Sequence, residues 1–294
     1  MNIKRVIIVL IILLITTSII YFINSQKNSE KLNDGKIGVG VSIGPEVEFV
    51  KAVGGDKVDV TLMMPPSADP HSYEPLPNQL SQVSNAKMYA EIGTSLEFET
   101  NYMDNIKAAN PNMLIVNTSK GINLIPNSAE GEANTVDPHV WVDPKNAEIM
   151  VNNIYDGLVK VDPGDKEYFT KNRDNYIQQI KELDSNTTKL LKSKNGSYIL
   201  IYHPSFGYYA KDYNMTQIGA MINDEEPSPQ RIAMMIDIAK KYNIKTLYSE
   251  PQYNLNFMES IASQAGARVV TVNDLDENYL ENMAKIATTF ANNS

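Results

Sequence analysis

Short apolar runs alternate with amphipathic stretches along most of the chain. Runs rich in β-branched residues predict strands, and apolar residues that recur every three or four positions predict helices. In the first half, the pattern predicts strands at residues 37–41, 58–63, 88–90 and 113–116. It predicts helices between these strands, at residues 45–53, 77–83 and 96–109. Such alternation is typical of a parallel α/β sheet.

The second half of the chain repeats this arrangement. It predicts strands at residues 197–202, 215–218, 246–248 and 268–271. Helical patterns follow at residues 206–212, 229–242, 255–265 and 278–291. We therefore expect an α/β protein of two doubly wound lobes, formed by residues 35–161 and 196–294.

A longer helical pattern, at residues 162–195, lies between the two halves. Asp162 followed by Pro163 is typical of an N-cap with proline at the first helical position. The apolar residues that share one helical face are Phe169, Tyr176, Ile180, Leu183 and Leu190. A helix of about 30 residues is about 45 Å long, enough to join both lobes as one rigid connector. The pattern also fits an ordinary surface helix.

The N-terminal segment has a different character. Residues 6–23 carry no charge and are mostly apolar, and Lys4 and Arg5 precede them. A run of this length is typical of a membrane anchor or a long signal peptide. We favour an uncleaved anchor, because no small-residue cleavage site precedes Asn24. Since basic flanks stay in the cytoplasm, residues 1–34 would be anchor and linker. The rest of the chain would lie on the outer face of the cytoplasmic membrane.

Composition narrows the functions that are open to the chain. Its hydrophobic content of 43% allows sizeable cores, and without cysteine it has no disulfide or thiolate metal site. A net charge of −9 argues against nucleic acid as a partner and mildly favours the attraction of cations. The glycines after the first predicted strand depart from a dinucleotide fingerprint, because Ile43 occupies the place of the third glycine.

The chain contains three histidines, and each adjoins a proline. His71 and His139 end two copies of Asp-Pro-His, and His203 ends a predicted strand. Neutral imidazole is the commonest protein ligand for first-row divalent metals. The wide spacing does not match a zinc finger or a zincin helix, so the rings would have to converge through tertiary structure. The crevice at the carboxyl ends of the strands, between the lobes, is the expected place. Three unrelated polar or capping histidines are the alternative.

The aspartates of the two tripeptides have two interpretations. Proline restricts both its own backbone and that of its neighbour, which would hold each histidine in place before a metal arrives. Asp69 and Asp137 would then accept the second ring N–H of the histidines, as outer-shell carboxylates do. Alternatively, they only initiate turns.

Residues 67–75, 137–144 and 202–208 occur in an order and at spacings that resemble a known family. They resemble the metal-specific solute-binding proteins of ABC importers, the cluster A-I or TroA-like group. The resemblance extends from residue 37 to the C-terminus and includes residues 249–252. It implies two α/β lobes bridged by one long helix, with a metal buried between them.

The resemblance also implies a ligand set. It gives metal-ligand roles to His71, His139 and His203, and the family's usual fourth ligand, an aspartate, matches Asp274. Asp276, Glu250 and water are alternatives for the fourth position. Of these, Glu250 is more easily read as a brace for its loop.

The donor set favours zinc as the bound metal. Three imidazoles and one carboxylate suit tetrahedral zinc, whereas manganese prefers more oxygen ligands. Manganese and iron(II) remain alternatives, because residues 121–136 lack the histidine-rich loop of many zinc-specific members. The chain also lacks the lipid-anchoring cysteine of many relatives.

We therefore expect an extracytoplasmic substrate-binding protein rather than an enzyme. It would capture a divalent metal as a monomer and deliver it to an ABC permease and, through the permease, to its ATPase. A zinc-dependent hydrolase is one alternative, and it would need an open coordination position for water. A metal-stabilised adhesive surface protein is another.

Overall fold

The computed structural model describes residues 35–65, 68–69, 72–126, 135–222 and 225–293. The predicted anchor at residues 6–23 and the predicted ligand His71 lie outside these residues. Within the described ranges, no helix combines the length and the apolar character that a membrane crossing requires. The chain from Ile37 onwards forms one compact unit.

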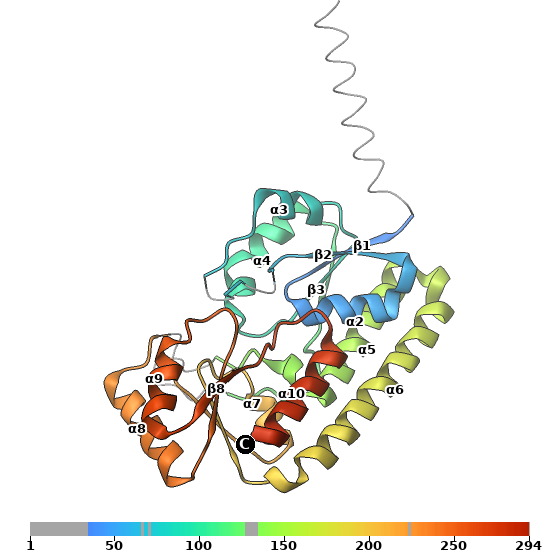
Figure 1. Cartoon of the computed structure of the whole chain (residues 1–294). Helices are drawn as coiled ribbons and strands as arrows, with labels where there is room; N and C mark the ends of the chain where they lie inside the picture. The colour runs from blue at the N-terminus through green and yellow to red at the C-terminus, as the bar shows by residue number, and fades with distance from the viewer. Residues whose placement is uncertain (1–34, 66–67, 70–71, 127–134, 223–224, 294) are drawn as a thin grey trace, which may run out of the picture. The chain divides into compact units, whose positions relative to one another are not determined.

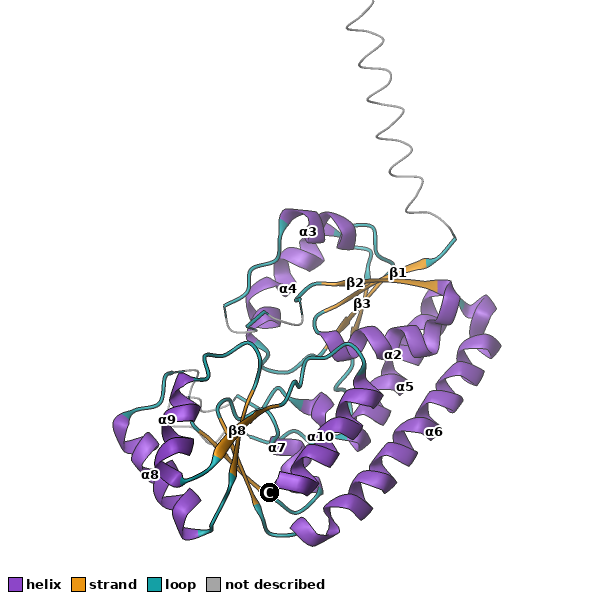
Figure 2. Ribbon diagram, viewed as in Figure 1, coloured by secondary structure: helices purple, strands orange, loops and turns teal. Residues whose placement is uncertain are grey.

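The first half of this unit forms a four-stranded parallel sheet with helices on both faces (Figures 1 and 2). Its strands, in the order β2-β1-β3-β4, are β1 (Ile37–Val41), β2 (Val58–Leu62), β3 (Met88–Glu91) and β4 (Leu114–Asn117). One face is covered by α2 (Gly44–Gly54) and α5 (Pro144–Val161). The other is covered by α3 (Pro77–Val83) and α4 (Glu97–Ala109).

The second half repeats this order with four further parallel strands. In the order β6-β5-β7-β8, they are β5 (Tyr198–Ile201), β6 (Thr216–Gly219), β7 (Thr246–Ser249) and β8 (Arg268–Thr271). One face is covered by α8 (Pro229–Lys241) and α9 (Asn256–Ala265). The other is covered by α7 (Gly207–Asp212) and α10 (Tyr279–Asn293). The predicted doubly wound α/β fold is confirmed. Apart from the connecting helix, each helix and strand whose two ends were predicted ends within two residues of the prediction.

The predicted connector is the helix α6 (Lys166–Leu191), with short 3-10 turns at Pro163–Asp165 and Lys192–Lys194. Asp162 accepts a hydrogen bond from the Gly164 N–H and so caps the first turn rather than α6 itself. The helix packs against α2, α5 and α10 (Figure 1), which makes it a link between the halves rather than a free surface helix.

The buried face of α6 differs from the predicted one at a single position. Leu190 is 44% exposed, whereas Leu191 is 2% exposed. Four-residue steps along the buried face run from Leu183 through Thr187 to Leu191, so the predicted seven-residue step to Leu190 reaches the edge of the stripe. The prediction for Leu190 was wrong for this reason.

One apolar core extends through both halves. It contains residues of the first sheet, of α6 and of α10, together with Phe206 and Tyr248 from the second half. A second, smaller core lies under α8 and α9. Because α10 contacts Phe49 of α2 through Tyr279 and Tyr248 of β7 through Phe290, the last helix joins the second sheet to a helix that covers the first. The lobe boundaries at residues 35–161, 162–195 and 196–294 remain predictions.

Candidate metal site

Three predicted or alternative ligands of the second half lie just beyond the carboxyl ends of adjacent strands. His203 follows β5, Glu250 follows β7 and Asp274 follows β8. The relative exposure of these residues is 5%, 0% and 3%. Parallel strands bring such loops to one edge of the sheet, as the sequence predicted.

His139 reaches the same edge from the first half of the chain. It precedes a 3-10 turn at Val140–Val142 and then α5, which Asp143 caps by accepting a hydrogen bond from the Lys145 N–H. Asp137 Oδ1 accepts from the backbone N–H of His139 at 3.0 Å and lies 2.8 Å from its ring Nδ1. One carboxylate oxygen therefore both forms a turn and orients the imidazole, so the two interpretations of Asp137 are compatible.

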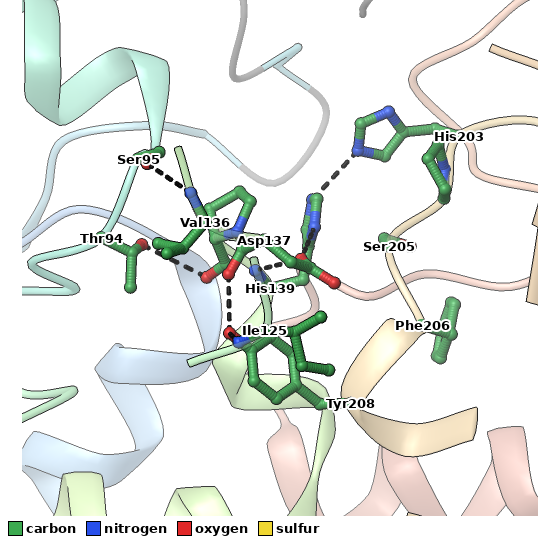
Figure 3. Close-up of polar contacts among 12 residues, drawn as sticks. Thr94, Ser95, Ile125, Val136, Asp137, His139, His203, Ser205, Phe206 and Tyr208 are labelled. Atoms are coloured by element: carbon green, nitrogen blue, oxygen red, sulfur yellow. Dashed lines mark hydrogen bonds and ion pairs between the residues drawn. The ribbon is translucent and has the colours of Figure 1, made fainter. Parts of the chain in front are cut away.

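The rings of His139 and His203 meet across the two halves (Figure 3). Their Nε2 atoms are 3.0 Å apart, and the ring centroids are 4.9 Å apart. Because Nδ1 of His139 faces a carboxylate, the ring presents Nε2 to His203. Two imidazole ligands of a tetrahedral zinc ion, each at about 2.0–2.1 Å, have nitrogens about 3.3 Å apart. If the two rings moved slightly further apart, such an ion could therefore bind between their Nε2 atoms.

Glu250 serves as the predicted brace for the His203 loop. Its Oε2 accepts from the His203 backbone N–H at 3.4 Å, and its Oε1 accepts from Ser205 Oγ at 3.2 Å. Burial raises the pKa of Glu250 well above its ordinary value, and the nearby charge of Asp274 raises it further. Glu250 is thus engaged by the loop and lies close to Asp274.

Asp274 is held at the site through its backbone. Its carbonyl oxygen accepts a hydrogen bond of 2.8 Å from the indole Nε1 of Trp141, whose ring lies 5.2 Å from that of His139. Asp276, by contrast, accepts from the backbone and side-chain nitrogens of Asn278 and so forms a turn.

Among the described residues, no group of three or more His, Cys, Asp or Glu side chains is arranged to hold a metal. Of the four predicted ligands, the structure brings His139 and His203 into contact, and His71 lies outside the described residues.

A buried carboxyl network, which no sequence pattern indicated, lies at the carboxyl edge of the first sheet. Glu46 accepts from the backbone N–H of Ser42, and Glu99 accepts from Ser42 Oγ. Glu99 also accepts from the N–H groups of Ile92 and Gly93, at 2.6 and 2.8 Å, beyond the end of β3. Burial raises the pKa of Glu99 to about 7, against the opposing effect of these donors. The network ties the loops after β1 and β3 together.

Glu99→Gln is expected to flatten the dependence of stability on pH. The raised folded-state pKa means that the folded protein keeps this proton to a higher pH than the unfolded chain, whose glutamate titrates near 4.3. The stabilisation is therefore complete at low pH and is lost, by up to about 3 kcal/mol, as the pH rises through about 7. Urea unfolding at pH 5 and pH 8 measures this difference. Glu259→Gln, on the exposed side of α9, is the control, and equal slopes in both variants would contradict the expectation.

Comparison with known proteins places this geometry in a family. The model of the family described as zinc-uptake complex component A, periplasmic, matches residues 39–293. The high-affinity zinc uptake system protein ZnuA of Bacillus subtilis is 32% identical in an alignment of 271 residues that covers 86% of this chain and 83% of that protein.

Two further relatives agree with this result. The zinc-binding protein AdcA of Streptococcus pyogenes is 30% identical in an alignment of 279 residues that covers 88% of this chain and 54% of AdcA. The chain thus spans about half the length of that relative. A crystal structure of ZnuA superposes with a TM-score of 0.83 and 31% identity, covering 88% of this chain and 99% of the other. With a family model that covers nearly all of the chain beyond residue 38, and a relative of almost full length, the chain belongs to the ZnuA family of zinc-uptake components.

Proposed function

We propose that this protein captures a divalent transition metal between its two halves and delivers it to an ABC permease and its ATPase. The observation that carries the proposal is the contact between His139 and His203, whose Nε2 atoms lie 3.0 Å apart although the residues are 64 positions apart in sequence. Imidazole nitrogens at this separation, beside the loop that carries the buried Asp274, suit a first-row cation. The relatives named for zinc uptake and zinc binding support the same conclusion.

The proposed ligands are His71, His139, His203 and Asp274. Three imidazoles and one carboxylate favour zinc as the cargo, with manganese and iron(II) as weaker candidates. Glu250 is a poorer choice for the fourth ligand than Asp274, because two hydrogen bonds from the His203 loop already occupy its oxygens. In this proposal the protein is a monomer. It acts on the outer face of the cytoplasmic membrane, anchored by or secreted through residues 6–23.

Membership of a zinc-uptake family makes the chain a binding component rather than an enzyme. A hydrolase would require an open coordination position with a general base beside it. Glu250, a buried carboxylate that accepts from the His203 backbone, is instead engaged in holding the loop. Among the described residues, no specific feature favours hydrolysis or adhesion.

The proposal predicts that zinc affinity falls as the pH drops through about 6.5, because protonated imidazoles cannot ligate a metal. The measurement is a competition titration of the metal-free full chain with zinc and, separately, with manganese, between about pH 5 and 7.5. Binding should be tighter for zinc than for manganese at the upper pH. A variant with His71→Ala, His139→Ala and His203→Ala together is the control. Binding that stays constant across this range, or equal metal retention by wild type and triple variant, would contradict the assignment.

The transport part of the proposal needs a separate test in cells. Deleting the gene should impair growth when zinc is limiting, and added zinc should restore it. Growth that is unaffected by the deletion in limiting zinc would contradict a role in uptake, even if the purified protein binds the metal.

A further inference from the structure

Two aromatic side chains donate hydrogen bonds from one half of the chain to the backbone of the other. The first is Trp141, which follows His139 by two residues and is 1% exposed. Its Nε1 donates to the carbonyl oxygen of Asp274 in the second half, at 2.8 Å. The indole therefore fixes the backbone from which the Asp274 carboxylate projects.

The second is Tyr208 of α7, which makes the reciprocal contact (Figure 3). Its hydroxyl donates to the carbonyl oxygen of Asp137 at 2.9 Å and accepts from the N–H of Ile125 at 3.0 Å, both in the first half. The Asp137 N–H in turn donates to the Ile125 carbonyl at 2.9 Å. Tyr208 is 4% exposed, and its hydroxyl thus bridges the backbones of Ile125 and Asp137.

The close approach of α7 to Asp137 depends on a glycine. A Cβ atom at Gly207 would lie 2.3 Å from Oδ2 of Asp137, so any side chain there would have to displace the Asp137 carboxylate. The hydrogen bonds of Tyr208 and the absence of a side chain at Gly207 therefore both allow α7 to contact Asp137. The contact bears directly on His139, because Oδ1 of Asp137 holds its ring at Nδ1.

The Asp137–His139 segment is also held from within its own half. Thr94 Oγ1 donates to the Pro138 carbonyl at 3.4 Å, and Ser95 Oγ accepts from the Val136 N–H at 3.1 Å (Figure 3). These bonds leave Tyr208 as the hydrogen-bonding link that joins this segment to α7. Loss of the phenol hydroxyl would therefore remove one of the hydrogen bonds that hold the His139 loop against the second half, while the Trp141 bond and the bonds within the first half remain.

We propose that Trp141 and Tyr208 are positioning residues, each of which places, from one half of the chain, a metal-ligand loop that belongs to the other. The inference rests on the proposed function, since it takes His139 and Asp274 to be ligands. A tetrahedral zinc site depends on the angle between ligands from both halves, whereas manganese accepts more variable, oxygen-rich coordination. The two hydrogen bonds therefore contribute to zinc affinity and to the preference for zinc over manganese.

The test uses Trp141→Phe and Tyr208→Phe in the full chain, because each variant removes the polar group and keeps an aromatic ring. Tyr176→Phe is the matched control. Its hydroxyl also makes a 2.7 Å bond between helices, to Glu48, and the residue is similarly buried at 4%, but it lies on α6. Dissociation constants for zinc and for manganese are measured separately, together with the melting temperature of the metal-free protein.

Each positioning variant is expected to bind zinc about 10-fold more weakly, the lower end of the effect of losing an outer-shell partner. The ratio of the two dissociation constants should also narrow, which a general loss of stability would not cause. Tyr176→Phe should keep the wild-type ratio. An unchanged ratio in both positioning variants, whether or not the melting temperature falls, would overturn the inference. Failure of the wild type to bind either metal would instead refute the proposed function.

Discussion

Replacing His139 or His203 with alanine is expected to lower zinc affinity by more than about 100-fold, a loss greater than that caused by removing an outer-shell partner. Each ring supplies one nitrogen at the point where the halves meet, and water is a weaker ligand in its place. Competition titration at about pH 7.5 measures the loss. The metal-free variants should melt within about 3 °C of wild type, since the two rings contact each other where the halves meet and belong to neither apolar core.

A matched pair of aspartates provides the control for this prediction. Asp274→Asn should weaken zinc binding strongly, because it removes the proposed carboxylate ligand and keeps the shape of the side chain. Asp276→Asn, two residues further along, should have little effect, because asparagine can still accept the turn hydrogen bond from the Asn278 N–H. Wild-type affinity in His139→Ala and His203→Ala, or a larger loss in Asp276→Asn than in Asp274→Asn, would contradict the proposed ligand set.

Phe290→Ala is expected to destabilise the protein by about 3–5 kcal/mol, the range for removing a buried phenyl ring. Phe290 is 0% exposed, and its ring lies 5.4 Å from that of Phe206 and 4.8 Å from that of Tyr248. The substitution would leave a cavity where α10 meets the second sheet. Urea unfolding at constant pH measures the change in the free energy of unfolding.

Lys285→Ala, on the exposed side of the same helix, is the control and should change stability by less than about 0.5 kcal/mol. A loss below about 1 kcal/mol in Phe290→Ala would mean that α10 is not an integral part of the core.

The fold could be predicted largely from local patterns. Runs of β-branched residues marked the strands, and prolines marked the first turns of α5 and α8. The misplacement of Leu190 shows the limit of this approach. Near the end of a helix, two adjacent leucines both approach the buried stripe, and tertiary packing rather than spacing decides which one is covered.

The candidate site, too, has features that the sequence predicts and others that depend on tertiary contacts. Histidines beside prolines at strand ends were visible in the sequence, and His139 and His203 do meet. The hydrogen bonds of Trp141 and Tyr208 had no local signal, because they join residues 133 and 71 positions apart. The Glu99 network was missed for a similar reason, since its donors come from loops after different strands. The ligand roles of His71, His139, His203 and Asp274 remain predictions.

The position of α10 has a consequence for the order of events during synthesis. Residues from this helix, including Tyr279 and Phe290, complete an apolar core that begins with β1. An emerging chain therefore has no cover for Phe49 of α2, or for Phe206 and Tyr248 of the second half, until the final helix leaves the ribosome. A nascent chain stalled before residue 279 would display aromatic surface that chaperones recognise.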